Sequence, residues 1–359
     1  SIPDMTAATD KGVSNSDNIT NDATPSFTGT AEAGSTITLL DGATSVGTAR
    51  ASAAGVWTIT SATLADGVHN IATSALDAAG NLATSAALVV AIDTLPPAAP
   101  PMATLAPGSD SGSSASDNIT NITTPSFVGT AEAGATVMLY NGTTKVGTGI
   151  AGADGAWSIT ATTLAAGVRN ITVKAADAAG NTSVASPVLA VTIDTTIARP
   201  SRPDLTAASD TGTSSTDNIT SDTTPVFTGT AEAGSTVTLL DGTTAVGTTI
   251  AAADRSWSIT ASPLLDGVHA ISAIAADVAG NVSLASAALA VTIDSQILTP
   301  SIPDMTAATD KGVSNSDNIT NDARPTFTGT AEASSTITLL DGATSVGTAR
   351  AGAAGVWTI

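Results

Sequence analysis

The chain has 359 residues, no cysteine, and 11 Lys and Arg against 31 Asp and Glu, which gives a formal net charge of −20. The absence of cysteine excludes disulfides and thiolate metal sites, and the acidic balance argues against nucleic acid or an anionic membrane as a partner, because both bind clustered cations. No apolar run approaches the length of about 18 residues that a membrane-spanning helix needs, so direct membrane insertion is not expected either.

The sequence repeats with a period of one hundred residues. One Asp, one Phe and one Trp mark this register in every repeat, for example at Asp17, Phe27 and Trp57. Residues 301–359 restate residues 1–59 with four changes, at Arg324, Thr326, Ser334 and Gly352. Because the period is about one domain length, we predict four domains, at residues 1–95, 96–195, 196–295 and, truncated, 296–359. The chain opens on Ser1 and ends inside a strand pattern, so we expect it to be a piece of a longer protein.

Each repeat predicts the same elements in the same order. A short strand near Met5 is followed by a polar loop and then by four alternating strands around residues 27–31, 37–39, 46–48 and 57–59. The second repeat shows the last two strands most clearly, at residues 171–175 and 189–193. Period-two alternation between Gly, Asn, Asp and Pro turns predicts an all-β chain of tandem immunoglobulin-like β-sandwich domains with about seven strands each. The short proline-bearing linkers predict an extended rod.

The polar loop after the first strand is a candidate metal site. Calcium binds about six to eight oxygen atoms from carboxylates, amide and backbone carbonyls and water, and this loop offers such groups in every repeat. The loop can fold to either end of its sandwich, so it either completes a site at the junction between repeats or holds its own ion. The predicted Ca²⁺ ligands of this loop are Asp10, Asp17, Asn18, Asp110, Asp117, Asn118, Asp210, Asp217, Asn218, Asp310, Asp317 and Asn318.

Further candidate ligands lie where neighbouring repeats should meet. In a seven-strand sandwich the loop between the last two strands lies at the pole where the domain begins, whereas the last strand ends at the opposite pole. We therefore expect Asp93 to approach Asp177 and Asn181 across the linker. The loop ligands are Asp77, Asn81, Asp177, Asn181, Asp277 and Asn281, the strand-end ligands are Asp93, Asp194 and Asp294, and a turn adds Glu132, Glu232 and Glu332.

Each candidate also has a structural interpretation. Asp-x-x-Gly-Asn suits a tight turn, because Asp and Asn bond their own backbone and Gly tolerates positive φ. The loop from Asp10 to Asn18 equally fits a set of solvated turn formers. His69 is replaced by Arg169 in the second repeat, which fits an exposed strand face, and the Trp of each repeat fits sheet packing better than sugar stacking.

Several sequence motifs recur along the whole chain, and together they resemble those of a known family. They are Asp-x-Gly-x-Ser-x-x-Asp-Asn-Ile-Thr, Thr-Pro-x-Phe-x-Gly-Thr-Ala-Glu-Ala-Gly, Gly-x-Trp and Asp-Ala-Ala-Gly-Asn. They resemble the tandem bacterial immunoglobulin-like repeats of giant type I-secreted calcium-binding adhesins and biofilm-associated proteins. The resemblance implies a secreted stalk at the bacterial cell surface, stiffened by calcium, with the host or abiotic surface contacted through a module outside this chain.

Catalysis has little support in the sequence. There is no cysteine, no His shared by all repeats and no phosphate-binding Gly-Lys-Ser or Gly-Lys-Thr loop, so no nucleophile and base recur together. We expect no enzymatic activity. The main alternative is a set of repeats that themselves bind a glycan or a host protein, whereas an ice-binding surface is disfavoured because the Thr residues are spread over different strands.

Overall fold

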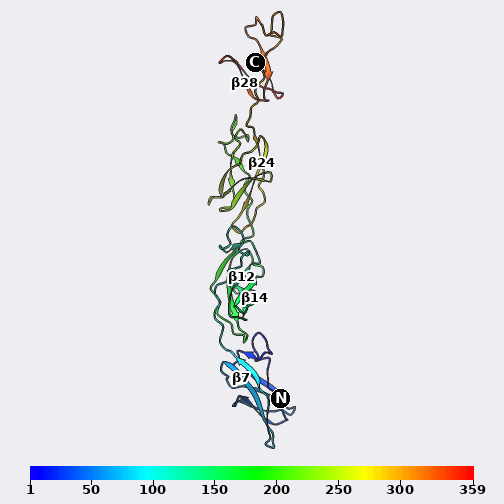
Figure 1. Cartoon of the computed structure of the whole chain (residues 1–359), viewed down its shortest axis with the longest axis vertical. Coiled ribbons are helices and arrows are strands. Elements are labelled where there is room, and N and C mark those ends of the chain that lie inside the picture. The colour runs from blue at the N-terminus through cyan, green and yellow to red at the C-terminus, as the bar shows by residue number, and fades with distance from the viewer. The chain divides into compact units, whose positions relative to one another are not determined.

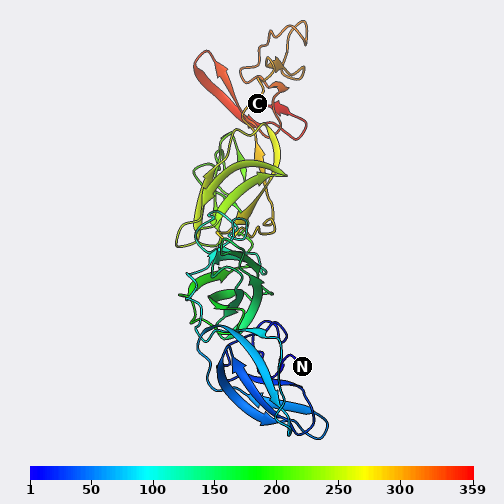
Figure 2. The same ribbon diagram turned by 60° about the horizontal axis from the view of Figure 1, so that its bottom comes forward.

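The computed structural model describes all residues from Ser1 to Ile359 and contains strands and loops without helices, as Figures 1 and 2 show. The all-β prediction is therefore confirmed. Since no helix forms, none is long and apolar enough to cross a membrane. The chain forms two compact units, Ser1–Ala198 with Ala276–Ser283, and Arg199–Ala275 with Leu284–Ile359.

The first two repeats lie in the first unit. Repeat 1 contains β1 (Asp4–Met5), β2 (Ile19–Thr20), β3 (Ser26–Thr30), β4 (Thr36–Asp41), β5 (Thr44–Arg50), β6 (Val56–Thr60), β7 (Gly67–Leu76), β8 (Leu82–Thr84) and β9 (Leu88–Ile92). Repeat 2 contains β10 (Thr104–Leu105), β11 (Ile119–Thr120), β12 (Ser126–Thr130), β13 (Thr136–Asn141), β14 (Thr144–Ile150), β15 (Ala156–Thr160), β16 (Gly167–Ala176) and β17 (Leu189–Ile193).

The later repeats follow the same order. Repeat 3 contains β18 (Asp204–Leu205), β19 (Ile219–Thr220), β20 (Val226–Thr230), β21 (Thr236–Asp241), β22 (Thr244–Ile250), β23 (Ser256–Thr260), β24 (Gly267–Ala276) and β25 (Leu289–Ile293). Repeat 4 contains β26 (Asp304–Met305), β27 (Phe327–Thr330), β28 (Thr336–Asp341), β29 (Thr344–Arg350) and β30 (Val356–Thr358).

Each complete repeat is a sandwich of two sheets. In repeat 1 the smaller sheet has the order β1-β3-β6, and the larger has the order β2-β9-β7-β4-β5 with β8 beside β7. Repeats 2 and 3 form the corresponding sheets β10-β12-β15 with β11-β17-β16-β13-β14, and β18-β20-β23 with β19-β25-β24-β21-β22. The seven predicted strands all have counterparts. The short strand β2 was not predicted, and it pairs in parallel with β9.

The core lies between the two sheets and follows from strand alternation. In β6 the residues alternate between exposed and buried, so Trp57 and Ile59 point inward. They meet Phe27, Ile37 and other apolar side chains from both sheets. Burying a side chain of this size contributes about 1.5–3 kcal/mol, so each complete repeat has its own source of stability.

A glycine lets the tryptophan of each repeat lie flat against the neighbouring strand. Gly29 of β3 pairs with Trp57 of β6, and a Cβ atom at Gly29 would lie 2.5 Å from the indole Cζ2. The same close approach occurs at Gly129, Gly229 and Gly329. The Gly and Trp of this pair therefore form one structural unit, which explains why both keep the register of the repeat.

Candidate metal centre

The loop between β16 and β17 is a tight turn held by its own polar side chains. Asp177 accepts hydrogen bonds from the Asn181 backbone N–H at 2.9 Å and from the Asn181 side-chain amide at 2.9 Å. Gly180 has a φ of 92°, a conformation that favours glycine. The structural interpretation of Asp-x-x-Gly-Asn as a turn is therefore correct, and the turn presents its oxygen atoms at a fixed place.

The same turn also contacts the preceding repeat. The Asn181 Nδ2 donates a hydrogen bond to the backbone carbonyl of Asp93 at 2.7 Å, and the Asn281 Nδ2 donates to that of Asp194 at 2.9 Å. Asp93 and Asp194 directly follow β9 and β17. The structure thus brings together the strand-end Asp and the following loop, as strand direction predicted.

Burial differs between the loop of repeat 1 and the same loop of repeat 2. Asp77 and Asn81 make the same internal hydrogen bonds as their counterparts, but Asn81 is exposed and Asp77 only half-buried. Hydrogen bonds from the Asn81 side chain and backbone lower the pKa of Asp77. Asp177 and Asn181, by contrast, are only 7% and 9% exposed. The contact with repeat 1 therefore removes these polar groups from water.

The loop from Asp10 to Asn18 supplies the other side of this contact. Val13 donates its backbone N–H to the Ala178 carbonyl at 3.1 Å, and a Cβ at Gly12 would lie only 2.2 Å from the same oxygen. In the next junction the Ser113 N–H donates to Val278 at 3.2 Å, and the Ser111 hydroxyl donates to Ala279 at 2.8 Å. The loop thus folds toward the following repeat, a direction that the sequence left open.

Within this loop Asp10 is buried and Asp17 is exposed. The Asp10 Oδ2 accepts the Asn18 N–H at 3.1 Å, and Asn18 has a left-handed φ of 60°. Burial raises the pKa of Asp10, and the negative charges of Asp17 and Asp4 raise it further against the lowering effect of the Asn18 hydrogen bond. The Asp17 Oδ1 accepts a hydrogen bond from the Ile19 N–H at 3.1 Å, which is the local contact expected of an Asp in a turn.

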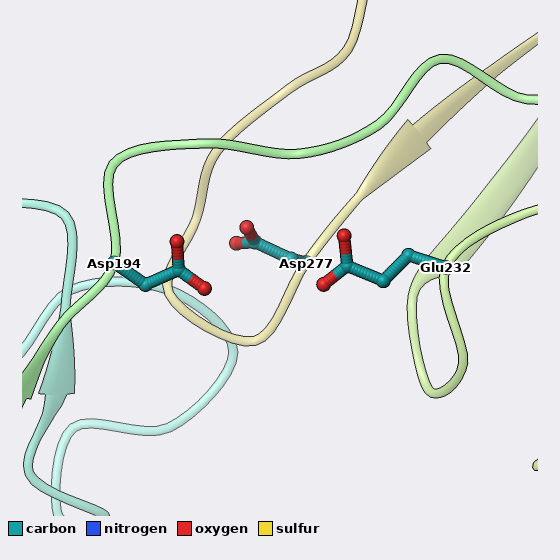
Figure 3. A group of neighbouring side chains, drawn as sticks. All are labelled: Asp194, Glu232 and Asp277. Atoms are coloured by element: carbon teal, nitrogen blue, oxygen red, sulfur yellow. The ribbon is translucent and has the colours of Figure 1, made fainter. Parts of the chain in front are cut away.

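Two carboxylates of the first compact unit have the spacing of a metal site. Figure 3 shows the side chains of Asp194 and Asp277 directed toward one another, and one carboxylate oxygen of each lies within 4.8 Å of the other. Calcium–oxygen bonds of about 2.3–2.6 Å allow ligand oxygens up to about 5 Å apart. An acidic cluster of this kind can hold a metal ion.

The other predicted ligands differ in exposure and in their hydrogen bonds. Glu132 is exposed, whereas Glu332 accepts the Leu298 N–H at 3.2 Å. Asp294 is exposed at the end of β25. Asp4, whose negative charge raises the pKa of Asp10, was not predicted, because it does not recur in every repeat: repeat 2 has Thr104 at this position.

The chain was compared with known proteins. A family model described as bacterial Ig-like domain (Big_13) matches residues 1–94, 97–195, 196–295 and 296–359. The search of curated proteins gave no match.

Among solved structures, one from a 1.5-MDa bacterial ice-binding adhesin is 19% identical, covers 81% of this chain and 95% of its own, and has a TM-score of 0.31. Fibronectin(III)-like modules of Clostridium thermocellum CbhA are 17% identical over 49% of this chain and 87% of theirs, with a TM-score of 0.32. A biofilm-associated protein BSP domain is 15% identical over 76% of this chain and 63% of its own, with a TM-score of 0.21. Scores this low carry no argument about function.

Proposed function

Because the chain belongs to the bacterial Ig-like domain family over almost its whole length, we propose that it is a non-enzymatic stalk segment of a bacterial surface adhesin. The match confirms the family to which the repeated phrases point. In this proposal the four repeats divide at residues 95, 195 and 295, form a rod outside the cell, and carry an adhesive module elsewhere in the protein.

The observation that carries the proposal is the burial of Asp177 and Asn181 against repeat 1, while Asp77 and Asn81 remain accessible. Two loops with the same Asp-Ala-Ala-Gly-Asn sequence thus have different environments, and the neighbouring repeat makes the difference. A group that is polar, recurrent and buried only at a junction supports a role in restraining the angle between repeats.

Calcium would supply that restraint. The strand-end carboxylate and the loop carboxylate belong to successive repeats, and Asp194 and Asp277 lie close enough to share one ion. Two carboxylates repel each other, so a divalent cation between them would convert repulsion into attraction. Extracellular sites bind calcium with dissociation constants of about 10⁻⁴ to 10⁻³ M, which suits an ion that binds after export.

Small-angle scattering of the full chain tests the proposal. We expect a shorter maximum dimension in chelator than in millimolar calcium, and an intermediate value for Asp177→Ala in calcium, because only one junction loses its carboxylate. Calorimetry on the same samples should show melting temperatures higher in calcium by the order of 10 °C, since calcium at about 100 times the dissociation constant adds about 2.7 kcal/mol per site.

Asp77→Ala is the matched control, because it changes the same turn in a loop whose side-chain hydrogen bonds stay within repeat 1, and it should leave the dimension of this chain unchanged. Identical scattering and melting curves in chelator and calcium would disprove calcium stiffening. A glycan array that binds the parent chain would favour the alternative of a binding module.

A further inference from the structure

Two junctions between repeats lie within the first compact unit, and they differ at one position of the loop after the first strand. Repeat 1 has Lys11 at this position, whereas repeat 2 has Ser111. The turn of repeat 3 that repeat 2 contacts lies in the segment Ala276–Ser283, which belongs to the same compact unit. The two side chains make different hydrogen bonds, and only one of them reaches the next repeat.

Ser111 connects its own loop to the turn of repeat 3. Its Oγ donates a hydrogen bond to the Ala279 carbonyl at 2.8 Å and accepts one from the Asn121 backbone N–H at 2.9 Å. The Asn121 Oδ1, at 3.0 Å, competes for the same hydroxyl proton, but the Ala279 oxygen is closer. Ala279 is buried, and a hydrogen bond removed from water is electrostatically stronger than one in solvent.

Lys11 makes all its hydrogen bonds within repeat 1. Its Nζ forms an ion pair with the Asp22 carboxylate at 2.9 Å, and its backbone N–H donates to the Thr20 hydroxyl at 3.2 Å. A carboxylate is a stronger partner for an ammonium group than a carbonyl is. The Ala179 carbonyl, which corresponds to that of Ala279, therefore receives no hydrogen bond from Lys11.

The other groups of the Ser111 contact are present at the first junction as well. Asn21 and Ala179 stand at the positions of the Asn and the Ala described above. A Cβ added at Gly180 would lie 3.7 Å from the Asn21 amide nitrogen, and the corresponding distance at the second junction is 3.5 Å. The loop and the turn thus meet in the same way at both junctions. Because the acceptor is a backbone carbonyl, the replacement of Ala178 by Val278 beside it does not remove it.

Repeat 3 shows that a hydroxyl at this position is held by its own loop. The Thr211 Oγ1 accepts the Ser221 backbone N–H at 2.9 Å, in the way that Ser111 accepts that of Asn121. All hydrogen bonds of the Thr211 side chain lie within repeat 3. The loop therefore fixes the hydroxyl oxygen without help from another repeat, so little further ordering is needed when a turn binds.

We propose that the residue at the position of Lys11 and Ser111 determines how firmly a repeat holds the Asp-x-Ala-Gly-Asn turn of the next repeat when no metal ion is bound. A hydroxyl at this position binds the turn through a backbone carbonyl, whereas a lysine does not. This inference rests on the proposed function of a stalk and deepens it, because it makes the stiffness of successive junctions unequal without calcium.

Hydrogen exchange of single amides in the full chain, measured by NMR in chelator, tests the proposal. The Val13 N–H reports the first junction because it donates to the Ala178 carbonyl, and the Ser113 N–H reports the second because it donates to the Val278 carbonyl. We expect Lys11→Ser to slow Val13 exchange roughly two- to tenfold, the factor that one net hydrogen bond contributes. Ser111→Ala should accelerate Ser113 exchange by a similar factor.

Lys11→Ala is the matched control, because it removes the ion pair with Asp22 without adding a hydroxyl. It should leave Val13 exchange unchanged. Equal slowing in Lys11→Ser and Lys11→Ala would overturn the proposal, since the loss of the lysine would then be the cause. An unchanged Val13 rate in Lys11→Ser, or an unchanged Ser113 rate in Ser111→Ala, would overturn it as well.

The result can be separated from that of the proposed function, because every exchange rate is measured without calcium. If scattering is identical in chelator and calcium while Lys11→Ser slows Val13 exchange, calcium stiffening fails and the role of the hydroxyl stands. If scattering responds to calcium while Lys11→Ser leaves Val13 unchanged, the role of the hydroxyl fails and calcium stiffening stands.

Discussion

Asn181 shows how one side chain serves both the turn and the junction. Its amide nitrogen donates to the Asp177 carboxylate at 2.9 Å and to the Asp93 carbonyl at 2.7 Å. The turn interpretation of this residue is therefore confirmed, and the contact with the preceding repeat is confirmed as well, whereas its role as a metal ligand stays a prediction. The carbonyl oxygen of the same amide remains the group that could bind an ion.

His69 illustrates a different kind of residue-level constraint. Its Nδ1 lies 2.7 Å from an Asp41 carboxylate oxygen and its Nε2 lies 2.8 Å from the Ala65 carbonyl. Both partners only accept hydrogen bonds, and a neutral imidazole has only one N–H, so the geometry favours the imidazolium. Burial opposes the charge, but the hydrogen bonds from His69 to Ala65 and Asp41 outweigh it and raise the pKa of His69.

The pH dependence of this pair has a definite sign. The stabilisation is fully present below the unfolded pKa of about 6.5 and is lost as the pH rises through the raised pKa of the folded state. We expect His69→Gln to destabilise repeat 1 by about 0.2–1 kcal/mol at pH 5.5 and by less at pH 8. Thermal melts of both proteins at the two pH values measure the difference.

Repeat 2 supplies the control, because Asn141 and Arg169 replace the Asp and His and the guanidinium does not titrate in this range. Arg169→Gln should therefore change stability equally at both pH values. If the effect of His69→Gln grows toward pH 8 instead, the imidazolium assignment is wrong.

At the scale of elements, the loop between β1 and β2 links the two sheets and also contacts the next repeat. Gly12 has a φ of 144° and lies directly against Ala178. Its counterpart Gly212 has a φ of 115°, and the nearest atom that its Cβ would meet is the Ile219 oxygen at 4.0 Å. The two glycines therefore share a positive φ, which favours glycine, but differ in the atoms that a Cβ would meet within this chain.

This pair of glycines gives a matched test of the contact between repeats. Gly12→Ala should separate the loop from Ala178 and break the hydrogen bond from Val13, which contributes about 0.5–1.5 kcal/mol. We expect hydrogen exchange at the Val13 amide to become roughly three- to tenfold faster. Gly212→Ala should leave Val13 exchange unchanged, and equal effects of both variants would refute the contact.

Most strands were predictable from sequence because one face of each is buried. In β6 and β15 every second residue is buried in the core, and this period of two can be recognised in the sequence. The two-residue strand β2 has no alternation to detect, and it forms because the chain crosses from one sheet to the other and meets β9. The direction of the Asp10 loop was not predictable either, since it depends on a contact with another repeat.

One contact of the candidate site could be predicted from the sequence, whereas the burial of Asp10 could not. Strand direction placed Asp93 near Asn181 correctly, because the two ends of a sandwich are fixed by the number of strands. The Asp10 Oδ1 is buried without a hydrogen-bond partner, which is a property of three-dimensional packing, so no spacing in the sequence could reveal it. That the predicted residues bind calcium stays a prediction.

At the scale of the whole molecule, nearly identical sequences have different packing. Phe27, Ile37 and Leu39 are fully buried in repeat 1, whereas Phe327 and Leu339 are only half-buried in repeat 4. The reason is that β4 pairs with both β5 and β7, whereas β28 pairs with β29 alone.

We therefore expect protection from hydrogen exchange to differ along the chain. Amides of β28 should exchange at least about tenfold faster than those of β4, because each half-exposed side chain forfeits part of about 1.5–3 kcal/mol of burial. Exchange measured by mass spectrometry on the full chain compares residues 301–359 with residues 1–59 directly. Equal protection would show that the two segments are equally stable despite their different packing.

The close approach of glycine and tryptophan in each sandwich gives the protein an optical property. The chain has four tryptophans, one in each repeat, all buried and each lying against a glycine of the adjacent strand. Each indole has the same glycine contact, so intrinsic fluorescence reports the sum of four buried emitters, one for each repeat. Conversion of three of them to Phe would leave a single native chromophore, and the opening of one chosen sandwich could then be followed by its red shift.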